Sequence, residues 1–287
     1  MRTFADSHPF AAAAYFAAAA GVAMFSMDPV VLGLSLAGAL AMLALLGGLR
    51  PLGSHGWMLG MFIGMAAINP LTHHDGVTVL VVVNHNPVTL EACLYGLAAA
   101  GMITASLYWF RCFSRLMTSD RLLTLLSGLS PGLSLVVSMG LRYVPLFGRQ
   151  LKNVQMTQRA LGLYGEEAVV DRLRGGVRVF SVMTTWALEN GVITADSMTA
   201  RGYGLRRRSH FRKERFTLQD GVLTGLSAML AALALWGAAG RSVAYYPAFV
   251  MSPVTVRAGL GYSAYAALML LPHVIHAKEA IRWHFWK

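Results

Sequence analysis

Long runs of apolar residues without one Asp, Glu, Lys or Arg dominate the hydrophobic pattern of this chain. Six such windows each span 19 to 24 residues, and about 20 residues are needed to cross the hydrocarbon core of a membrane. They cover residues 7–27, Pro29–Leu49, Pro51–His74, Ala92–Phe110, Gly221–Gly240 and Ala258–Ala277. The pattern predicts an all-α polytopic membrane protein with about six transmembrane helices. A signal peptide is the alternative for the first window, but the equally long second window favours a retained helix.

The middle of the chain has a different, amphipathic pattern. Ser and Gly with Pro131 interrupt the charge-free stretch Leu122–Leu141 at 127–132, which predicts two shorter helices rather than a span. From Pro145 to about Gly162, apolar residues recur at three-, four- and seven-residue steps, and a second such helix runs from about Val177 to Arg201. The predicted apolar faces include Leu151 and Val154 on the first helix, and Val179, Val182, Met183, Trp186 and Ile193 on the second.

Composition and charge divide the chain into three parts. It has 287 residues, 56% of them hydrophobic and 13% charged, and its net charge is +11. Residues 111–215 hold 17 of the 24 Lys and Arg and 7 of the 13 Asp and Glu, so they carry +10 of that charge. We therefore expect four spans in 1–110, a cytoplasmic domain in 111–216 and two spans in 217–287, with both termini cytoplasmic. Arg241 and Arg257, which flank the last outer loop, do not fit this positive-inside pattern.

The predicted outer loop between the third and fourth windows carries the histidines. The β-branched run Val77–Val83 predicts an extended strand, and Asn69-Pro70 and Asn86-Pro87 look like turn and helix-start signals. A metal site from the loop's polar residues is not favoured, because their spacing fits no metal-binding pattern; they are His73, His74, Asp75 and His85. Cys93 and Cys112, the two cysteines, cannot pair if they share one helix, since they would then lie roughly 28 Å apart.

Small residues recur within the apolar windows. Gly60 and Gly64 form a G-x-x-x-G pattern, and Gly33, Ala37 and Ala41 repeat at four-residue spacing. Small residues let membrane helices approach closely. The two interpretations are packing within this chain and a face for a second membrane subunit.

The segment Thr194–Arg215, TADSMTARGYGLRRRSHFRKER, joins a helix end to the densest basic run of the chain. Gly202 and Gly204 are natural helix terminators, so Arg201 is expected in the last turn. A cation suits the negative end of a helix dipole, and a guanidinium can grip a carboxylate through two hydrogen bonds. The segment is either a positive-inside anchor or a docking tip for an acidic pocket on a partner.

Sequence motifs for catalysis and nucleotide binding are missing. The chain has no G-x-x-x-x-G-K-[ST] phosphate-binding loop and no G-x-S-x-G, H-E-x-x-H or C-x-x-C. We therefore expect a non-enzymatic subunit without a cofactor or a metal.

The chain resembles the transmembrane T component of energy-coupling factor transporters, the EcfT/CbiQ family, over essentially its whole length. The resemblance rests on NPLTHHDGVTVL, NPVTLEACLYGL, FRCFSRLMTSDRLLTLL, LSLVVSMGLRYVPLF and SMTARGYG, the last with Ala200, Arg201 and Gly202. It implies transmembrane helices plus a cytoplasmic domain of crossed amphipathic helices. Two of these helices end in Ala-Arg-Gly motifs, which dock on a pair of ABC ATPases, while a separate membrane S component binds a vitamin or metal ion.

The resemblance implies ATP-driven uptake across a bacterial or archaeal cell membrane, with two ATPase subunits, an S component and the lipid bilayer as partners and no nucleic acid. The apolar faces of the two long helices are expected to support the S component. One departure concerns the first motif, where aligning Gly162 with the family glycine puts Leu161 in place of the arginine. Arg159 lies two residues earlier, roughly 200° away around the helix.

Other functional classes are alternatives to this interpretation. The nearest is a self-contained ABC-type permease subunit, although the scarcity of charges within the spans argues against a pathway of its own for a polar solute. The others are a membrane-anchored metal-dependent enzyme using the loop histidines, and a membrane-anchored protein that binds lipid or nucleic acid through Arg206–Arg215.

Overall fold

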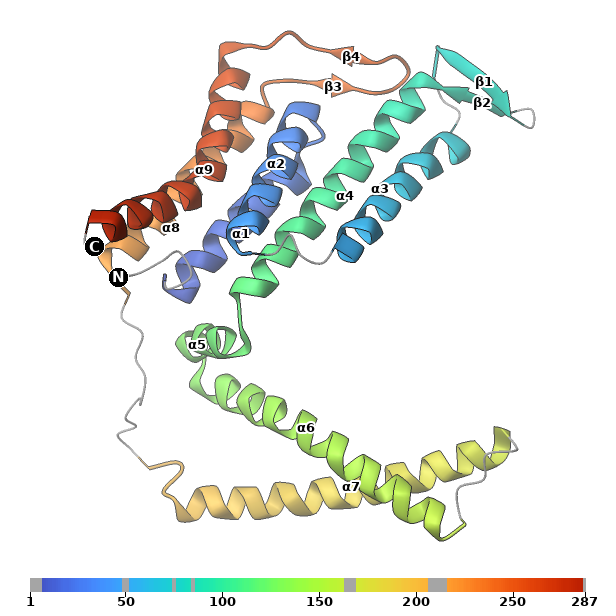
Figure 1. The fold of residues 1–287 in the computed structure, drawn as a ribbon, viewed down its shortest axis with the longest axis vertical. Coiled ribbons are helices and arrows are strands. Elements are labelled where there is room, and N and C mark those ends of the chain that lie inside the picture. The colour runs from blue at the N-terminus through green and yellow to red at the C-terminus, as the bar shows by residue number, and fades with distance from the viewer. Residues whose placement is uncertain are drawn as a thin grey trace. The chain divides into compact units, whose positions relative to one another are not determined.

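The computed structural model describes residues 7–47, 52–73, 76–83, 86–162, 169–205 and 216–285. Over these ranges the chain is mostly helical, with nine helices and two small antiparallel sheets (Figure 1). The helices are α1 Pro9–Phe25, α2 Pro29–Leu45, α3 Leu52–Thr72, α4 Leu90–Leu116, α5 Ser119–Leu129, α6 Pro131–Ala160, α7 Val169–Ala200, α8 Leu218–Ala238 and α9 Val256–Phe285. The strands are β1 Val79–Val83 paired with β2 Asn86–Thr89, and β3 Val243–Ala244 paired with β4 Val250–Met251.

Some residues of interest in the sequence lie outside the described residues. They are Arg2, Arg50, His74, Asp75, His85, the basic run 206–215 and Lys287.

The chain divides into two compact units. Unit 1 consists of Met1–Leu122 and Arg215–Lys287, and unit 2 is the intervening Leu123–Glu214. The predicted division at 110/111 falls inside α4, which continues to Leu116. Unit 2 is therefore an insertion between two parts of the sequence that fold together as unit 1.

Unit 1 is built around the buried faces of α4 and of the helix pair α8–α9. α1 packs against α4 and α8, α2 against α4 and α9, and α3 against α4. Trp109 of α4 is buried against the rings of Tyr15 and Phe16, and its indole nitrogen donates to Ser35 Oγ at 2.9 Å. The buried hydrogen bond orients α2 on α4, because the indole donor has to find its partner inside the core, and the ring contacts pack α1 against α4.

Glycines set the closest approaches between the helices of unit 1. A Cβ built on Gly237 of α8 would lie 2.3 Å from the Cα of Gly261 on α9. At Gly96 of α4 the same atom would lie 2.7 Å from the carbonyl oxygen of Ala66 on α3. Backbone therefore meets backbone at both crossings, as small residues allow.

The small-residue patterns noticed in the sequence lie elsewhere. Nothing lies within 4 Å of a Cβ built on Gly33, Gly60 or Gly64, and all three glycines are exposed. Packing within this chain was therefore the wrong interpretation for these residues. A face for a second membrane subunit stays a prediction.

Each of the six charge-free windows holds one helix of unit 1. Among the described residues, α4, α8 and residues Val256–Lys278 of α9 are long and apolar enough to span a membrane, which is compatible with a membrane protein. α1 and α2 are apolar but only 17 residues long, about 26 Å at 1.5 Å per residue. α3 has 21 residues and includes His55, Asn69 and Pro70. Six crossings remain a prediction.

Proline signals in the sequence were misread at three places. α6 begins at Pro131 and continues through Pro145. The sequence pattern had predicted that a helix starts at Pro145. Asn69 and Pro70 lie within α3, and Pro87 lies within β2 rather than at the start of α4. α4 begins two residues after Val88, with Thr89 as its N-cap.

The structure of unit 2 confirms the predicted break between two helices near residue 130 and the two predicted long helices. α5 and α6 are separated at Ser130, whose hydroxyl caps the start of α6 by accepting from the Leu133 amide at 3.4 Å. α6 has 30 residues and ends at the predicted place. α7 has 32 residues and begins at Val169, eight residues before the predicted start at Val177.

Candidate functional site

The crossing of α6 and α7 is the centre of unit 2. The Tyr143 and Thr194 hydroxyls share a hydrogen bond of 2.9 Å, and the ring of Phe147 meets that of Trp186 edge to face with centroids 5.4 Å apart. Val154 and Val179 are the buried aliphatic residues of this contact, with exposed fractions of 9% and 4%. Few residues are buried in unit 2, so most of the apolar surface of both helices stays open.

An apolar groove of about 640 Å³ lies beside this crossing. The two helices contribute Phe147, Gly148, Leu151, Gln155, Gly176, Val179, Phe180, Met183, Thr184, Ala187 and Leu188 to its walls. Phe180 and Leu188 at its edge are 73% and 68% exposed. Exposed apolar surface of this kind marks an interaction site more often than a water-facing surface.

The residues predicted for the apolar faces separate into three groups in the structure. Leu151 and Met183 line the groove, and Val154 and Trp186 lie in the contact between the helices. Val182 is 41% exposed and Ile193 is 58% exposed, and neither lines the groove. Positions 179 and 182 are three residues apart and therefore on one side of α7, so the shared apolar face of these residues stays a prediction.

The C-terminal end of α7 is a complete glycine cap. Gly202 has φ +80°, its amide donates to the Thr199 carbonyl at 2.9 Å, and the Tyr203 amide donates to the Met198 carbonyl at 2.9 Å. This pair of bonds defines a Schellman motif, in which Ala200 is the last helical residue and Arg201 the C-cap. The Arg201 side chain is exposed and has no hydrogen bond or ion pair with any residue that the structure describes.

The end of α6 repeats the same geometry with a different residue at the C-cap. Gly162 has φ +67° and its amide donates to the Arg159 carbonyl at 3.0 Å. The C-cap is Leu161, which is 62% exposed, so Leu161 occupies the position that Arg201 holds on α7. Arg159 lies two residues earlier and is also exposed.

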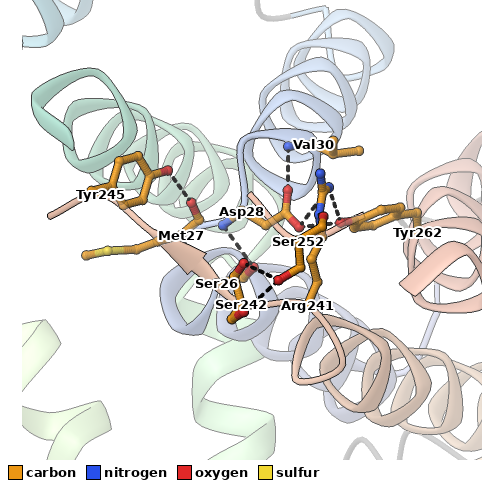
Figure 2. Close-up of polar contacts among 9 residues, drawn as sticks. All are labelled: Ser26, Met27, Asp28, Val30, Arg241, Ser242, Tyr245, Ser252 and Tyr262. Atoms are coloured by element: carbon orange, nitrogen blue, oxygen red, sulfur yellow. Dashed lines mark hydrogen bonds and ion pairs between the residues drawn. The ribbon is translucent and has the colours of Figure 1, made fainter. Parts of the chain in front are cut away.

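A second polar site lies in unit 1, where α2 begins and α8 ends (Figure 2). Arg241 forms a buried ion pair with Asp28, with Nη1 and Oδ2 3.5 Å apart and side chains 3% and 5% exposed. Arg241 also donates to the Tyr262 hydroxyl at 2.8 Å and to the Ser252 carbonyl at 3.1 Å. Tyr262 in turn donates to Asp28, which caps α2 by accepting from the Val30 amide at 3.0 Å.

The surroundings of this ion pair raise the pKa of two side chains in the loop between α8 and α9. The hydrogen bond with Tyr262, assisted by the charge of Asp28, raises the pKa of Arg241. Burial, assisted by the same carboxylate, raises the pKa of Tyr245, whose hydroxyl donates to the Met27 carbonyl at 2.7 Å. Both groups therefore keep their protons, and the site holds one positive and one negative charge.

Both arginines that did not fit the charge pattern have partners within unit 1. Arg241 is neutralised by Asp28, and Arg257 lies over the Trp236 ring, 4.4 Å from its centroid, while its Nε donates to the Trp236 carbonyl. Sequence analysis missed the pair because its members are 213 residues apart. The available signal was Asp28 directly before Pro29, a typical N-cap before a proline at the first helical position.

Metal binding has no support in the described part of the chain. No group of three or more His, Cys, Asp or Glu side chains there could hold an ion. Of the loop residues considered in the sequence, His73 is described, whereas His74, Asp75 and His85 lie outside the described residues.

Comparison with known proteins adds no family assignment: no family model matches the chain, and no curated protein matches it.

Proposed function

We propose that this chain is the membrane coupling subunit of an energy-coupling factor importer, the T component suggested by its sequence motifs. In this proposal it neither binds substrate nor hydrolyses ATP. Two ABC ATPase subunits supply the movement, and a membrane S component carries a vitamin or a metal ion. Unit 2 transmits the movement of the ATPases to the S component.

The exposed arginine at the end of α7 carries this proposal. Arg201 extends from a rigid Schellman cap on a helix of 32 residues, and its guanidinium has no described partner within the chain. A charge-assisted bidentate contact with a carboxylate contributes about 1.5–3 kcal/mol when it is shielded from water. Such a contact would hold an ATPase on the helix tip during repeated cycles.

The crossed helices suit mechanical coupling because α7 is continuous from Val169 to Ala200 and is held to α6 by Tyr143 and Phe147. Movement of the tip at Arg201 would therefore shift the whole helix, including the groove lined by Leu151 and Met183. We assign this groove and the exposed apolar residues around it to the S component. An apolar contact of this kind can be released and remade without leaving buried charges unpaired.

In the membrane, we propose that α1–α4, α8 and α9 form six spans, with both termini and unit 2 on the cytoplasmic side of a bacterial or archaeal cell membrane. The +10 charge of residues 111–215 supports this orientation through the positive-inside rule. Arg241 counts less against this orientation, because its charge is buried and paired with Asp28 inside unit 1. The buried charged residues in the described chain support it further, since they lie at helix ends: Asp28, Glu91, Asp220 and Arg241.

The test compares Arg201→Ala with Arg159→Ala in cells that carry the whole transporter. We expect Arg201→Ala to lose ATP-driven uptake and ATPase copurification at normal expression of the chain. The reason is that a partner carboxylate loses its cation in a partly dry groove, whereas Arg159 lies away from the C-cap. Arg201→Lys should rescue poorly, because lysine offers a point charge without the planar fork.

A matched control is Leu161→Ala, which changes the equivalent C-cap position of α6 without changing charge. If Leu161 makes an apolar contact with the first ATPase, this variant should weaken copurification less than Arg201→Ala. Normal uptake by Arg201→Ala, or a larger defect in Arg159→Ala than in Arg201→Ala, would contradict the assignment of the docking tip.

A further inference from the structure

The β1–β2 hairpin between α3 and α4 exposes an unusual amount of apolar surface. Val79, Leu80, Val81 and Val82 follow one another in β1, and their side chains are between 51% and 62% exposed. Val77, just before the strand, is 73% exposed. Water-facing strands normally avoid such a run, because it is a template for aggregation. The hairpin must therefore meet an apolar environment in the working protein.

The two faces of the strand are equally apolar and equally open. Leu80 lies at a β-bulge between Val79 and Val81, and beyond the bulge successive side chains point to opposite faces. The register therefore puts Val79 and Val82, which pair with Thr89 and Pro87, on one face and Val81, which pairs with Val88, on the other. A strand that packs one face on a protein partner has polar residues on its second face. Here both faces carry aliphatic residues, and neither face is covered by the rest of the described chain. An environment that surrounds the hairpin fits this pattern better than a partner that covers one side.

The base of the hairpin is polar and firmly attached to the start of α4. The Thr78 hydroxyl donates to Glu91 Oε1 at 2.6 Å, the Thr78 amide donates to the same carboxylate at 3.3 Å, and the Leu90 amide donates to the Thr78 carbonyl at 2.9 Å. Gly76 lies against this anchor, since a Cβ there would be 2.7 Å from Glu91 Oε2. The apolar strand is therefore fixed at the start of α4, a helix long and apolar enough to span a membrane.

We propose that the β1–β2 hairpin is a lipid-contacting element that lies in the membrane interface at the end of unit 1 where α4 begins (Figure 1). Residues 76–90 contain no Asp, Glu, Lys or Arg, so no charge opposes contact with lipid. The sheet has two strands, and its open edges leave backbone groups without ladder partners. Such edges are not tolerated in the hydrocarbon core, which places the hairpin at the interface, where water and headgroups satisfy them.

This position gives the hairpin a function that the spans alone do not provide. Because β2 runs directly into α4 at Leu90, lipid contact of the hairpin fixes the depth at which α4 starts. The proposal does not depend on the coupling function, since it concerns only the contact between residues 77–83 and lipid.

The experiment places an environment-sensitive fluorophore on each face of β1 in the full chain, reconstituted in lipid nanodiscs. In a Cys93→Ser/Cys112→Ala background, Val81→Cys and Val82→Cys carry the label, and Glu189→Cys, an exposed position of α7, is the water-facing control. Emission is measured with ordinary lipids and with lipids brominated along their acyl chains.

We expect blue-shifted emission and loss of intensity in brominated lipid at both Val81→Cys and Val82→Cys, and neither effect at Glu189→Cys. Water-like emission at both β1 positions would overturn the proposal. Lipid quenching on one face alone would overturn it too, and would indicate a face reserved for a protein partner. If a label at position 81 or 82 prevents folding, Val88→Cys, the partner of Val81, and Val79→Cys, on the face of Val82, probe the same two faces.

Discussion

The buried ion pair between Asp28 and Arg241 allows a quantitative prediction from the structure. Asp28→Asn removes the negative charge but keeps a side-chain oxygen that can cap α2 at the Val30 amide, so the charge effect is separated from the capping effect. Arg241, with a side chain only 3% exposed, would then be a buried cation that retains only neutral partners.

The magnitude follows from the distance and the burial. Two unit charges 3.5 Å apart attract each other by about 5 kcal/mol at an effective dielectric constant of about 20. Removing one member of a buried pair typically costs about 3–5 kcal/mol, because the remaining charge stays desolvated. We expect Asp28→Asn to lower the free energy of unfolding by this amount.

The reverse variant, Arg241→Met, should cost less. Asp28 would keep the Val30 amide and the Tyr262 hydroxyl as donors, and a carboxyl group can also take up a proton. Combining both substitutions should restore much of the loss, because the double variant leaves no buried charge at this site. The assay is reversible unfolding of the purified chain in mixed micelles, analysed as a double-mutant cycle.

Tyr245→Phe is the matched control, since it removes the nearby buried hydrogen bond to the Met27 carbonyl and changes no charge. It should cost about 1 kcal/mol. The reasoning is refuted if Asp28→Asn is no more destabilising than Tyr245→Phe, or if the losses of the two charge variants simply add in the double variant.

Two further predictions concern packing and topology. On α8, Gly237→Ala should destabilise unit 1, because a Cβ there would lie 2.3 Å from the Cα of Gly261. Gly225→Ala on the same helix should stabilise unit 1 by about 0.5–1 kcal/mol, since its Cβ meets open space. Thermal unfolding of both variants in detergent checks these opposite signs. A membrane-impermeant thiol reagent added to intact cells should label Asp75→Cys and miss Ser209→Cys, because residues 111–215 hold most of the net positive charge; labelling at Ser209→Cys would reverse the proposed topology.

Local signals in the sequence predicted the parts of the fold that depend on neighbouring residues. The Ser-Gly-Leu-Ser-Pro-Gly run predicted the break at Ser130, the β-branched run predicted β1, and Cys93 and Cys112 do lie on one helix, α4. The end of α6 was predicted correctly as well. Gly162 has no side chain and therefore readily adopts the positive φ that ends the helix.

Long-range packing overrode local signals elsewhere. Pro145 cannot donate to the Leu141 carbonyl, but α6 continues through it because Tyr143 and Phe147 on either side are held against α7. Pro87 is accommodated in β2 of an isolated two-stranded sheet, where an edge position needs no donor. The Asp28–Arg241 pair could not be predicted, because nothing in a single sequence indicates which of 24 Lys and Arg residues meets a given carboxylate.

The insertion of unit 2 has a consequence for the order in which the protein is made. The segment before α1 is fastened to the start of α8, where the His8 amide donates to Asp220 Oδ1 at 2.9 Å across 212 residues of sequence. At about 5–20 residues per second, the ribosome needs roughly 10 to 40 s to produce Asp220 after His8. α1 is thus synthesised long before α8, one of the helices it packs against, which appears only after all of unit 2. The first half of the membrane unit must wait in an incomplete state, so unit 2 is finished before unit 1 can close.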